Sequence, residues 1–238
     1  MFKNRFLIMT IDTSCKTTAC GLVLDGVTIA DFSVCDNKTH SVKLMPLIDK
    51  ALNYCGAIIE NVDLIAVTNG PGSYTGLRIG VVTAKTFAYI NNIPVIGVNT
   101  LDALAHGFIC GEQVLTVPVI DARNTRVYTT CYLGSEQIFD YNALTIAELC
   151  SFVTNDNKIN KDSTSVILCG DGLTEANKMI IDQLLPGYNL FYKDIIAPTP
   201  ASIAAIAMNE YAKSGSDSSM YTGEKLGVNY MKKYNAVI

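Results

Sequence analysis

Glycines and hydroxyl side chains that could hold an anion gather in one short segment, residues 69–78, which reads NGPGSYTGLR. Its chemically informative residues are Gly70, Gly72, Ser73, Thr75, Gly76 and Arg78. The glycines allow positive φ, and the hydroxyls precede a helix whose first N–H groups lack intrahelical partners. The spacing predicts either a turn that binds an anion such as phosphate, or a turn whose glycines let a second stretch of backbone come close.

Other signatures of chemistry are weak. The glycines miss the pattern G-x-G-x-x-G by one residue, and no Gly-Lys-Ser/Thr sequence follows them. The two histidines, His40 and His106, are far apart and lack neighbouring metal ligands. We therefore expect no metal site built by this chain alone, and we expect His40 to lie beside a helix start rather than to act as a base.

Apolar runs and turn residues define the elements that must position the glycine-rich segment. A buried strand over Asp63–Thr68 is expected before it, and a helix over Leu77–Asn91 is expected after it. Three further strands and a helix with Ser41 as N-cap are expected earlier in the chain: Phe6–Asp12, Ala19–Leu24, Val27–Val34 and Ser41–Cys55.

The second half repeats this order. Its expected strands and helices are Val114–Asp121, Arg126–Leu133, Gln137–Tyr141, a helix over Thr145–Thr154, Ser165–Cys169 and a helix ending at Leu185. An aspartate ends the first strand of each half, Asp12 and Asp121, and a glycine turn ends the fourth. The sequence therefore predicts an α/β fold with a duplicated βββαβα order in two lobes. A chance likeness between two ordinary α/β halves is the alternative.

The lobes can be assigned from this order. Residues 1–100 are expected to form the N-terminal lobe, completed by residues 200–238, and residues 101–199 to form the C-terminal lobe. A last helix is expected to reach Lys213, and a short strand or extended segment is expected over Gly227–Met231.

Charge and cysteine usage narrow the class of function. The net charge is −4 with only four arginines, which disfavours direct binding to nucleic acid. Eight cysteines without a secretion signal indicate a reducing compartment, so a cytoplasmic protein is expected. No apolar stretch of 18 or more residues occurs, so no membrane association is expected.

Two helices carry more apolar residues than one buried face needs. Between Leu77 and Ile90 only Arg78 and Lys85 are charged. Either both helices are enclosed within the lobe, or their outer faces meet another subunit, which we favour. The expected interface residues are Val42, Met45, Leu52, Val81, Val82, Lys85 and Tyr89. The same faces would form a homodimer when the chain is alone.

The chain resembles the TsaB family, also called YeaZ. The matching stretches are residues 11–14, 40–48, 69–80, 121–123 and 230–233. The resemblance implies the ASKHA fold shared by actin and sugar kinases. It also implies that Asp12, Thr13 and Ser14 match the turn that touches phosphate or metal in active members of that superfamily, with a hydrogen-bonded strand end as the alternative. Residues 73, 75 and 78 would fix the glycine turn and approach a partner or a nucleotide.

The resemblance also implies a function. A TsaB-like chain is a non-catalytic dimerisation subunit in the synthesis of tRNA threonylcarbamoyladenosine, beside a TsaD-like catalytic paralogue and a TsaE-like ATPase. The complex, rather than this chain, would contact tRNA. No cofactor is expected on this chain alone, although ATP or ADP could lie at a subunit interface. The paralogue's metal site needs two histidines four residues apart, whereas here Cys110 follows His106 at that offset.

Two enzyme classes are the rival interpretations. A protease would need a metal dyad or a nucleophile with its base, and neither H-E-x-x-H nor G-x-S-x-G occurs. A small-molecule kinase of the ASKHA fold is the more serious alternative, because Asp12 and the two glycine turns could bracket ATP. However, no charged cluster in the second half completes a magnesium-phosphate site.

Overall fold

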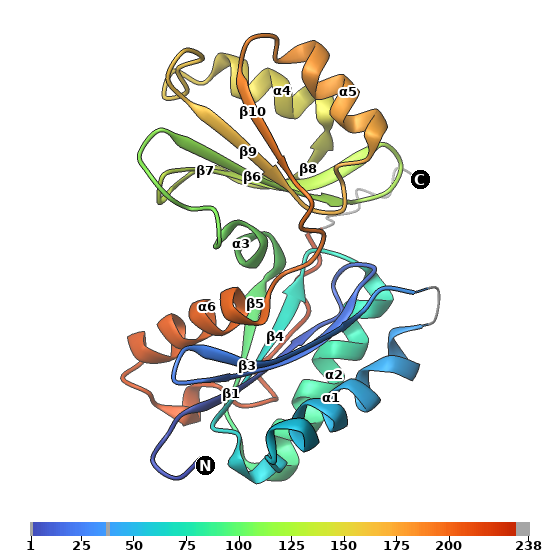
Figure 1. The fold of residues 1–238 in the computed structure, drawn as a ribbon, viewed down its shortest axis with the longest axis vertical. Helices are drawn as coiled ribbons and strands as arrows, with labels where there is room; N and C mark the ends of the chain where they lie inside the picture. Colours follow the sequence, from blue (N-terminus) through green and yellow to red (C-terminus); the bar gives the residue numbers. More distant parts are fainter. Residues whose placement is uncertain (1, 37–38, 232–238) are drawn as a thin grey trace. The chain divides into compact units, whose positions relative to one another are not determined.

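The structure, a computed structural model, describes residues 2–36 and 39–231. It divides into two compact units (Figure 1). Unit 1 comprises Met1–Ala103 and Ala197–Asn229, and the main part of unit 2 is Leu104–Ile196. Each unit contains one five-stranded sheet of mixed direction.

Unit 1 is built on a sheet with the strand order β3-β2-β1-β4-β5. The strands are β1 (Leu7–Asp12), β2 (Thr18–Leu24), β3 (Val27–Val34), β4 (Leu64–Gly70) and β5 (Val95–Asn99). Strands β1 to β3 are antiparallel neighbours, whereas β4 runs parallel to both β1 and β5. The sheet therefore brings the ends of β1 and β4 to the same edge, where Asp12 and Gly70 lie.

Helices cover both faces of this sheet. The side chains of β1 alternate between two cores, because successive residues of a strand point to opposite faces. Met9 packs in the core that contains residues of α1 (His40–Cys55) and α2 (Tyr74–Asn91), whereas Ile8 packs with α6 (Pro200–Lys213). Three short helical segments also lie in the described part of the chain: η1 (Ile59–Asn61), α3 (Thr100–Ala105) and η2 (Ser218–Met220).

Unit 2 repeats the arrangement with the order β10-β9-β6-β7-β8. Its elements are β6 (Val114–Asp121), β7 (Arg126–Leu133), β8 (Glu136–Thr145), α4 (Ile146–Asn155), β9 (Ser165–Cys169), α5 (Glu175–Leu184) and β10 (Asn189–Lys193). Numbered within each unit, both sheets have the order 3-2-1-4-5. The predicted α/β fold with a duplicated order is therefore confirmed.

Several details differ from the sequence-based expectation. Each unit has a fifth strand that was not predicted, β5 or β10, because five residues are too few to show a clear periodicity. Helix α1 begins after Thr39 rather than Ser41, and α2 begins at Tyr74 rather than Leu77. No strand forms over the expected tail segment Gly227–Met231, and residues 232–233 of the last matching stretch lie outside the described residues. Within the described ranges, no helix combines the length and apolar character needed to cross a membrane.

Candidate functional site

The buried carboxyl group of Asp12 is the centre of a hydrogen-bond network at the end of β1. Its Oδ1 atom accepts hydrogen bonds from the Ser14 backbone N–H at 3.0 Å, the Ser14 hydroxyl at 2.6 Å and the Thr68 hydroxyl at 2.6 Å. Its Oδ2 atom is buried and has no hydrogen-bond partner among the described residues. Burial raises the pKa of the Asp12 carboxyl, and the hydrogen bonds from Ser14 and Thr68 oppose that rise only partly.

The glycine-rich turn packs directly on this strand end. The Ser73 backbone N–H donates to the Ser14 carbonyl at 2.6 Å, and the Thr13 hydroxyl donates to the Gly76 carbonyl at 2.7 Å. A Cβ atom on Gly72 would collide with the Ser14 carbonyl, and one on Gly76 would collide with the Thr13 carbonyl. These glycines therefore let two stretches of backbone approach, which favours the second of the two expectations for this turn.

Ser73 also starts helix α2. Its hydroxyl accepts from the Gly76 N–H at 3.2 Å, as an N-cap side chain does. Thr75 and Arg78 are exposed in the first turns of the helix, and the Arg78 guanidinium lies 4.1 Å from the centre of the Tyr74 ring. The turn thus has a closed inner side, toward Ser14, and an exposed side that offers Thr75, Arg78 and Tyr74.

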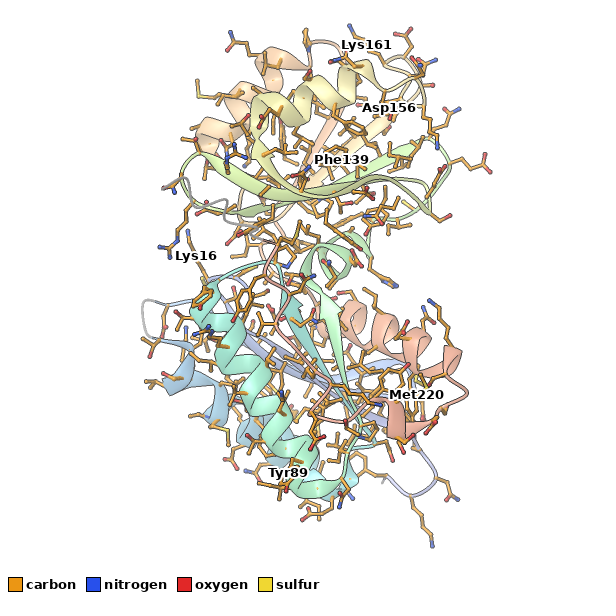
Figure 2. All side chains as sticks on the ribbon, turned by 180° about the vertical axis from the view of Figure 1, so that it is seen from behind. Lys16, Tyr89, Phe139, Asp156, Lys161 and Met220 are labelled. Carbon is orange, nitrogen blue, oxygen red and sulfur yellow. The ribbon has the colours of Figure 1, made fainter. Side chains whose placement is uncertain are left out.

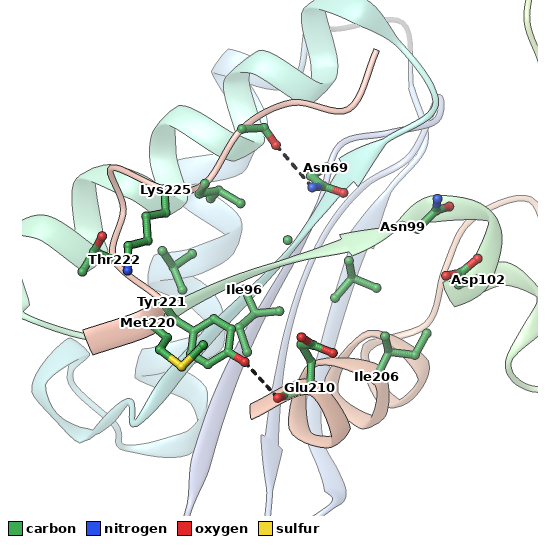
Figure 3. A pocket seen from close by; sticks show the side chains of 15 residues that line it. Asn69, Ile96, Asn99, Asp102, Ile206, Glu210, Met220, Tyr221, Thr222 and Lys225 are labelled. Atoms are coloured by element: carbon green, nitrogen blue, oxygen red, sulfur yellow. Dashed lines mark hydrogen bonds between the residues drawn. The ribbon is translucent and has the colours of Figure 1, made fainter. Parts of the chain in front are cut away.

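A segment near the end of unit 1, residues 222–229, covers the start of the turn. The Asn229 N–H donates to the Asn69 carbonyl at 2.7 Å, and the Asn69 side chain donates to the Gly227 carbonyl at 3.2 Å. Gly70 has a φ of 128°, and a Cβ atom there would collide with the Asn229 carbonyl. Figure 3 shows Asn69 beside this segment, at one end of a cavity of about 450 Å³ that also reaches β5 and α6.

His40 is an additional member of this site. Its ring Nδ1 lies 2.7 Å from the Thr18 hydroxyl oxygen, and a Cβ atom on Gly76 would lie 3.2 Å from its ring. Burial lowers the pKa of His40, so its neutral form is favoured. The sequence placed His40 beside a helix start, but contact with the glycine turn depends on the packing of α1 against α2 and has no local signal.

The residues expected to meet a partner separate into two groups. Four are well exposed: Val42 (61%), Met45 (51%), Val82 (60%) and Tyr89 (76%). Leu52 is half-buried against the core, and the Lys85 ammonium donates to the Leu226 carbonyl at 3.1 Å. Figure 2 shows Tyr89 near the C-terminal end of α2.

The expectation that Val81 lies on the outer face is wrong. Its exposed fraction is 3%, and it packs in the core with residues of β1 and α1. Successive helical residues point about 100° apart, so Val81 and Val82 cannot share a face. The sequence also missed three exposed residues of α1 and α2, namely Tyr54, Tyr74 and Ile90.

The corresponding positions of unit 2 are less enclosed. Asp121, which ends β6 as Asp12 ends β1, is exposed, and its Oδ1 accepts from the Arg123 N–H at 2.8 Å. Gly170 directly follows β9 and has a φ of 115°, and a Cβ atom there would collide with the Val119 carbonyl. Among the residues that the structure describes, no group of three His, Cys, Asp or Glu side chains could hold a metal ion. The buried carboxyl is thus a feature of unit 1.

Known proteins resemble this chain in sequence. The family model described as "TsaD: tRNA N6-adenosine threonylcarbamoyltransferase" matches residues 35–168, more than half of the chain. The tRNA threonylcarbamoyladenosine biosynthesis protein TsaB of Bacillus subtilis is 39% identical over 52% of this chain and 54% of that protein. TsaB of Escherichia coli is 32% identical over 54% of this chain and 56% of that protein. The chain therefore aligns with about half the length of these two relatives.

Solved structures resemble it in fold. YeaZ from Pseudomonas aeruginosa has a TM-score of 0.70 with 20% identity, covering 94% of this chain and 99% of that chain. A second solved structure from Pseudomonas aeruginosa, described as an uncharacterized protein with similarity to peptidase YEAZ, has a TM-score of 0.75 with 20% identity, covering 95% of this chain and 100% of that chain. The chain therefore belongs to the family described as tRNA N6-adenosine threonylcarbamoyltransferase, within which it groups with the TsaB (YeaZ) proteins.

Proposed function

We propose that this chain is a non-catalytic subunit in the biosynthesis of tRNA threonylcarbamoyladenosine, where it supports a TsaD-like catalytic subunit. The observation that carries the proposal is the set of exposed apolar side chains on α1 and α2: Val42, Met45, Val82 and Tyr89. Large exposed apolar patches are characteristic of interaction sites. The names of the relatives, which refer to biosynthesis of this nucleoside, support the process.

The spacing of these residues suits helix-on-helix docking. Val42 and Met45 are three residues apart on α1, and Val82 and Tyr89 are seven apart on α2, so each pair lies along one side of its helix. A partner that presents two comparable helices would bury all four residues. The same surface would form a homodimer when the catalytic subunit is absent, because an isologous contact needs only one such patch.

The closed inner side of the glycine turn supports a non-catalytic role. The Ser73 N–H, which could otherwise bind an anion, already donates to the Ser14 carbonyl at 2.6 Å. We therefore propose that this chain binds no nucleotide by itself. In the assembly, ATP or ADP and a TsaE-like ATPase would meet the exposed side of the turn, at Thr75 and Arg78, and tRNA would be held by the complex.

A matched pair of variants tests the docking surface. Val82→Glu places a carboxylate in the proposed interface at a residue that is 60% exposed, whereas Met179→Glu changes an apolar residue on α5 of unit 2 that is 72% exposed. Burying an unpaired carboxylate is costly, so we expect Val82→Glu to weaken binding to a TsaD-like protein by at least tenfold in analytical ultracentrifugation. Equal binding by wild type and both variants would refute the interface.

Separate experiments test the role in threonylcarbamoyladenosine biosynthesis and the absence of catalysis by this chain alone. In cells depleted of the endogenous protein, we expect wild type to restore threonylcarbamoyladenosine in tRNA, measured by nucleoside mass spectrometry, and Val82→Glu to fail. Titration calorimetry of the purified chain with ATP and Mg²⁺ should show no binding. Micromolar binding accompanied by phosphoryl transfer would instead establish a small-molecule kinase of the same fold.

A further inference from the structure

The corresponding edge strands of the two sheets, β5 and β10, differ in whether another segment covers their outer edge. Strand β5 ends the sheet of unit 1, and its outer edge is partly occupied: the Val95 N–H donates to the Tyr221 carbonyl at 2.8 Å. Figure 3 shows Tyr221 and its neighbours beside this strand. Such cover matters because the free N–H and C=O groups of an edge strand can pair with another chain.

The equivalent strand of unit 2, β10, pairs only with β9 in the part of the chain that the structure describes. Leu190 and Tyr192 point to the core beneath α4 and α5. Phe191 therefore points to the opposite face of the sheet, where it is 42% exposed. The strand thus offers a second chain both a backbone edge and an aromatic side chain at its midpoint.

Charged groups of α5 lie beside this edge. The Tyr192 hydroxyl donates to Asp182 Oδ1 at 2.8 Å. The Lys178 ammonium lies 3.0 Å from Glu175 Oε1 on the same helix and 5.8 Å from the centre of the Tyr192 ring. Lys178 and Asp182 are four residues apart and so share one side of α5. In an antiparallel pair of α5 helices, Lys178 of one copy would face Asp182 of the other, which makes the surface complementary to itself.

We propose that β10 is a self-association surface at which a second copy of this chain pairs antiparallel, about a two-fold axis at Phe191. This register places Phe191 opposite its own copy and Lys193 opposite Asn189 of the second copy. No like charges face one another along the strand, and the two sheets join into one. The surface lies on unit 2, so it is distinct from the α1 and α2 surface proposed above for the catalytic subunit.

Opposite charges introduced at Asn189 provide a matched test. Asn189→Lys and Asn189→Glu both lose the same 3.1 Å hydrogen bond to Ser165, but only the lysine would face Lys193 of the second copy with like charge. Sedimentation velocity measures the dissociation constant of the dimer, to which the two-fold axis contributes two such pairs. We expect Asn189→Glu to lower this constant and Asn189→Lys to raise it, each by roughly 2- to 30-fold. Adding Lys193→Glu to Asn189→Lys should restore the dimer. The same dissociation constant in all three variants would overturn the proposal.

A cross-link tests the register. Phe191→Cys should form an intermolecular disulfide with oxidised glutathione, because directly opposed residues of an antiparallel pair bring their Cβ atoms within disulfide range. Lys193→Cys, whose two copies would lie at opposite ends of the pairing, should cross-link no faster than wild type, which controls for the exposed Cys35 and Cys110. Both experiments are repeated with Val82→Glu, so that association through α1 and α2 is removed. Equal cross-linking at positions 191 and 193 would contradict the pairing.

Discussion

Single residues in the glycine-rich turn show how one sequence pattern can serve two purposes. Glycines and hydroxyls at this spacing suit an anion, yet Gly72 and Gly76 lack side chains because the carbonyls of Ser14 and Thr13 fill that space. Thr13 and Ser73 then bond across the contact. Both an anion-binding turn and a turn that packs against another stretch of backbone could be predicted from the sequence. Deciding between them requires knowing how a segment about 60 residues earlier packs against the turn.

Substitution of Gly76 tests this steric role. Gly76→Ala should destabilise unit 1 by about 1–3 kcal/mol, because a Cβ atom must displace the backbone of Thr13. Gly107→Ala is the control, since nothing lies within 4 Å of a Cβ atom at that position. Urea unfolding measures both variants. If Gly76→Ala were as stable as Gly107→Ala, the close approach of the two backbones would not be required.

The buried carboxyl of Asp12 should make stability depend on pH. Its raised pKa means that, above the ordinary value of 3.8, the folded protein keeps a proton that the unfolded chain has released. Stability from this group is therefore greatest at low pH, falls as pH rises, and levels off above the folded pKa. Asp12→Asn should flatten this part of the stability curve, measured by urea unfolding between pH 4 and 8.

The exposed Asp49 on α1 supplies the control for that experiment. Asp49→Asn makes the same change of side chain at an exposed position, so it separates the effect of replacing any aspartate from the effect of removing the buried carboxyl. The slope is the informative quantity, because any cost of burying the amide introduced by Asp12→Asn does not vary with pH. Parallel curves for wild type and Asp12→Asn would show that the folded carboxyl titrates normally.

Among the helices and strands, the sequence predicted those that are determined by local residue patterns. Apolar segments on both sides of the Asp25-Gly26 turn located β2 and β3, and Gly56 correctly ended α1 as a left-handed C-cap. The fifth strands were missed because they are fixed by parallel pairing with β4 and β9, partners distant in sequence. The face of α2 was also misjudged, because a helix that is apolar on most sides does not reveal which side the sheet covers.

The segment over residues 222–229 is held to α2 and β4 by few hydrogen bonds, so removing one should loosen it. Lys85→Met keeps the aliphatic stem but deletes the ammonium that donates to the Leu226 carbonyl at 3.1 Å. Exchange of the Asn229 amide hydrogen, followed by NMR, should become roughly 2- to 10-fold faster. Lys50→Met removes an ammonium of α1 that lies over the Phe32 ring of β3, and it should leave exchange of the Asn229 amide unaffected. If the Asn229 amide exchanged at the same rate in both variants, the hydrogen bond from Lys85 would not stabilise this segment.

The hydrophobic cores of the two units are separate, and this separation should be visible when a core leucine is truncated. Leu64 and Leu115 are both fully buried leucines, one on β4 in unit 1 and one on β6 in unit 2. Truncation of either to alanine should cost about 2–5 kcal/mol, because the cavity forms in a closely packed core. The two clusters that contain these leucines share no residues. Leu115→Ala should therefore speed amide exchange in β6, β7 and β9 and leave β1 and β4 protected. Leu64→Ala should speed exchange in β1 and β4 and leave β6, β7 and β9 protected. Uniform loss of protection across both sheets, in either variant, would mean that the two units unfold as one cooperative body.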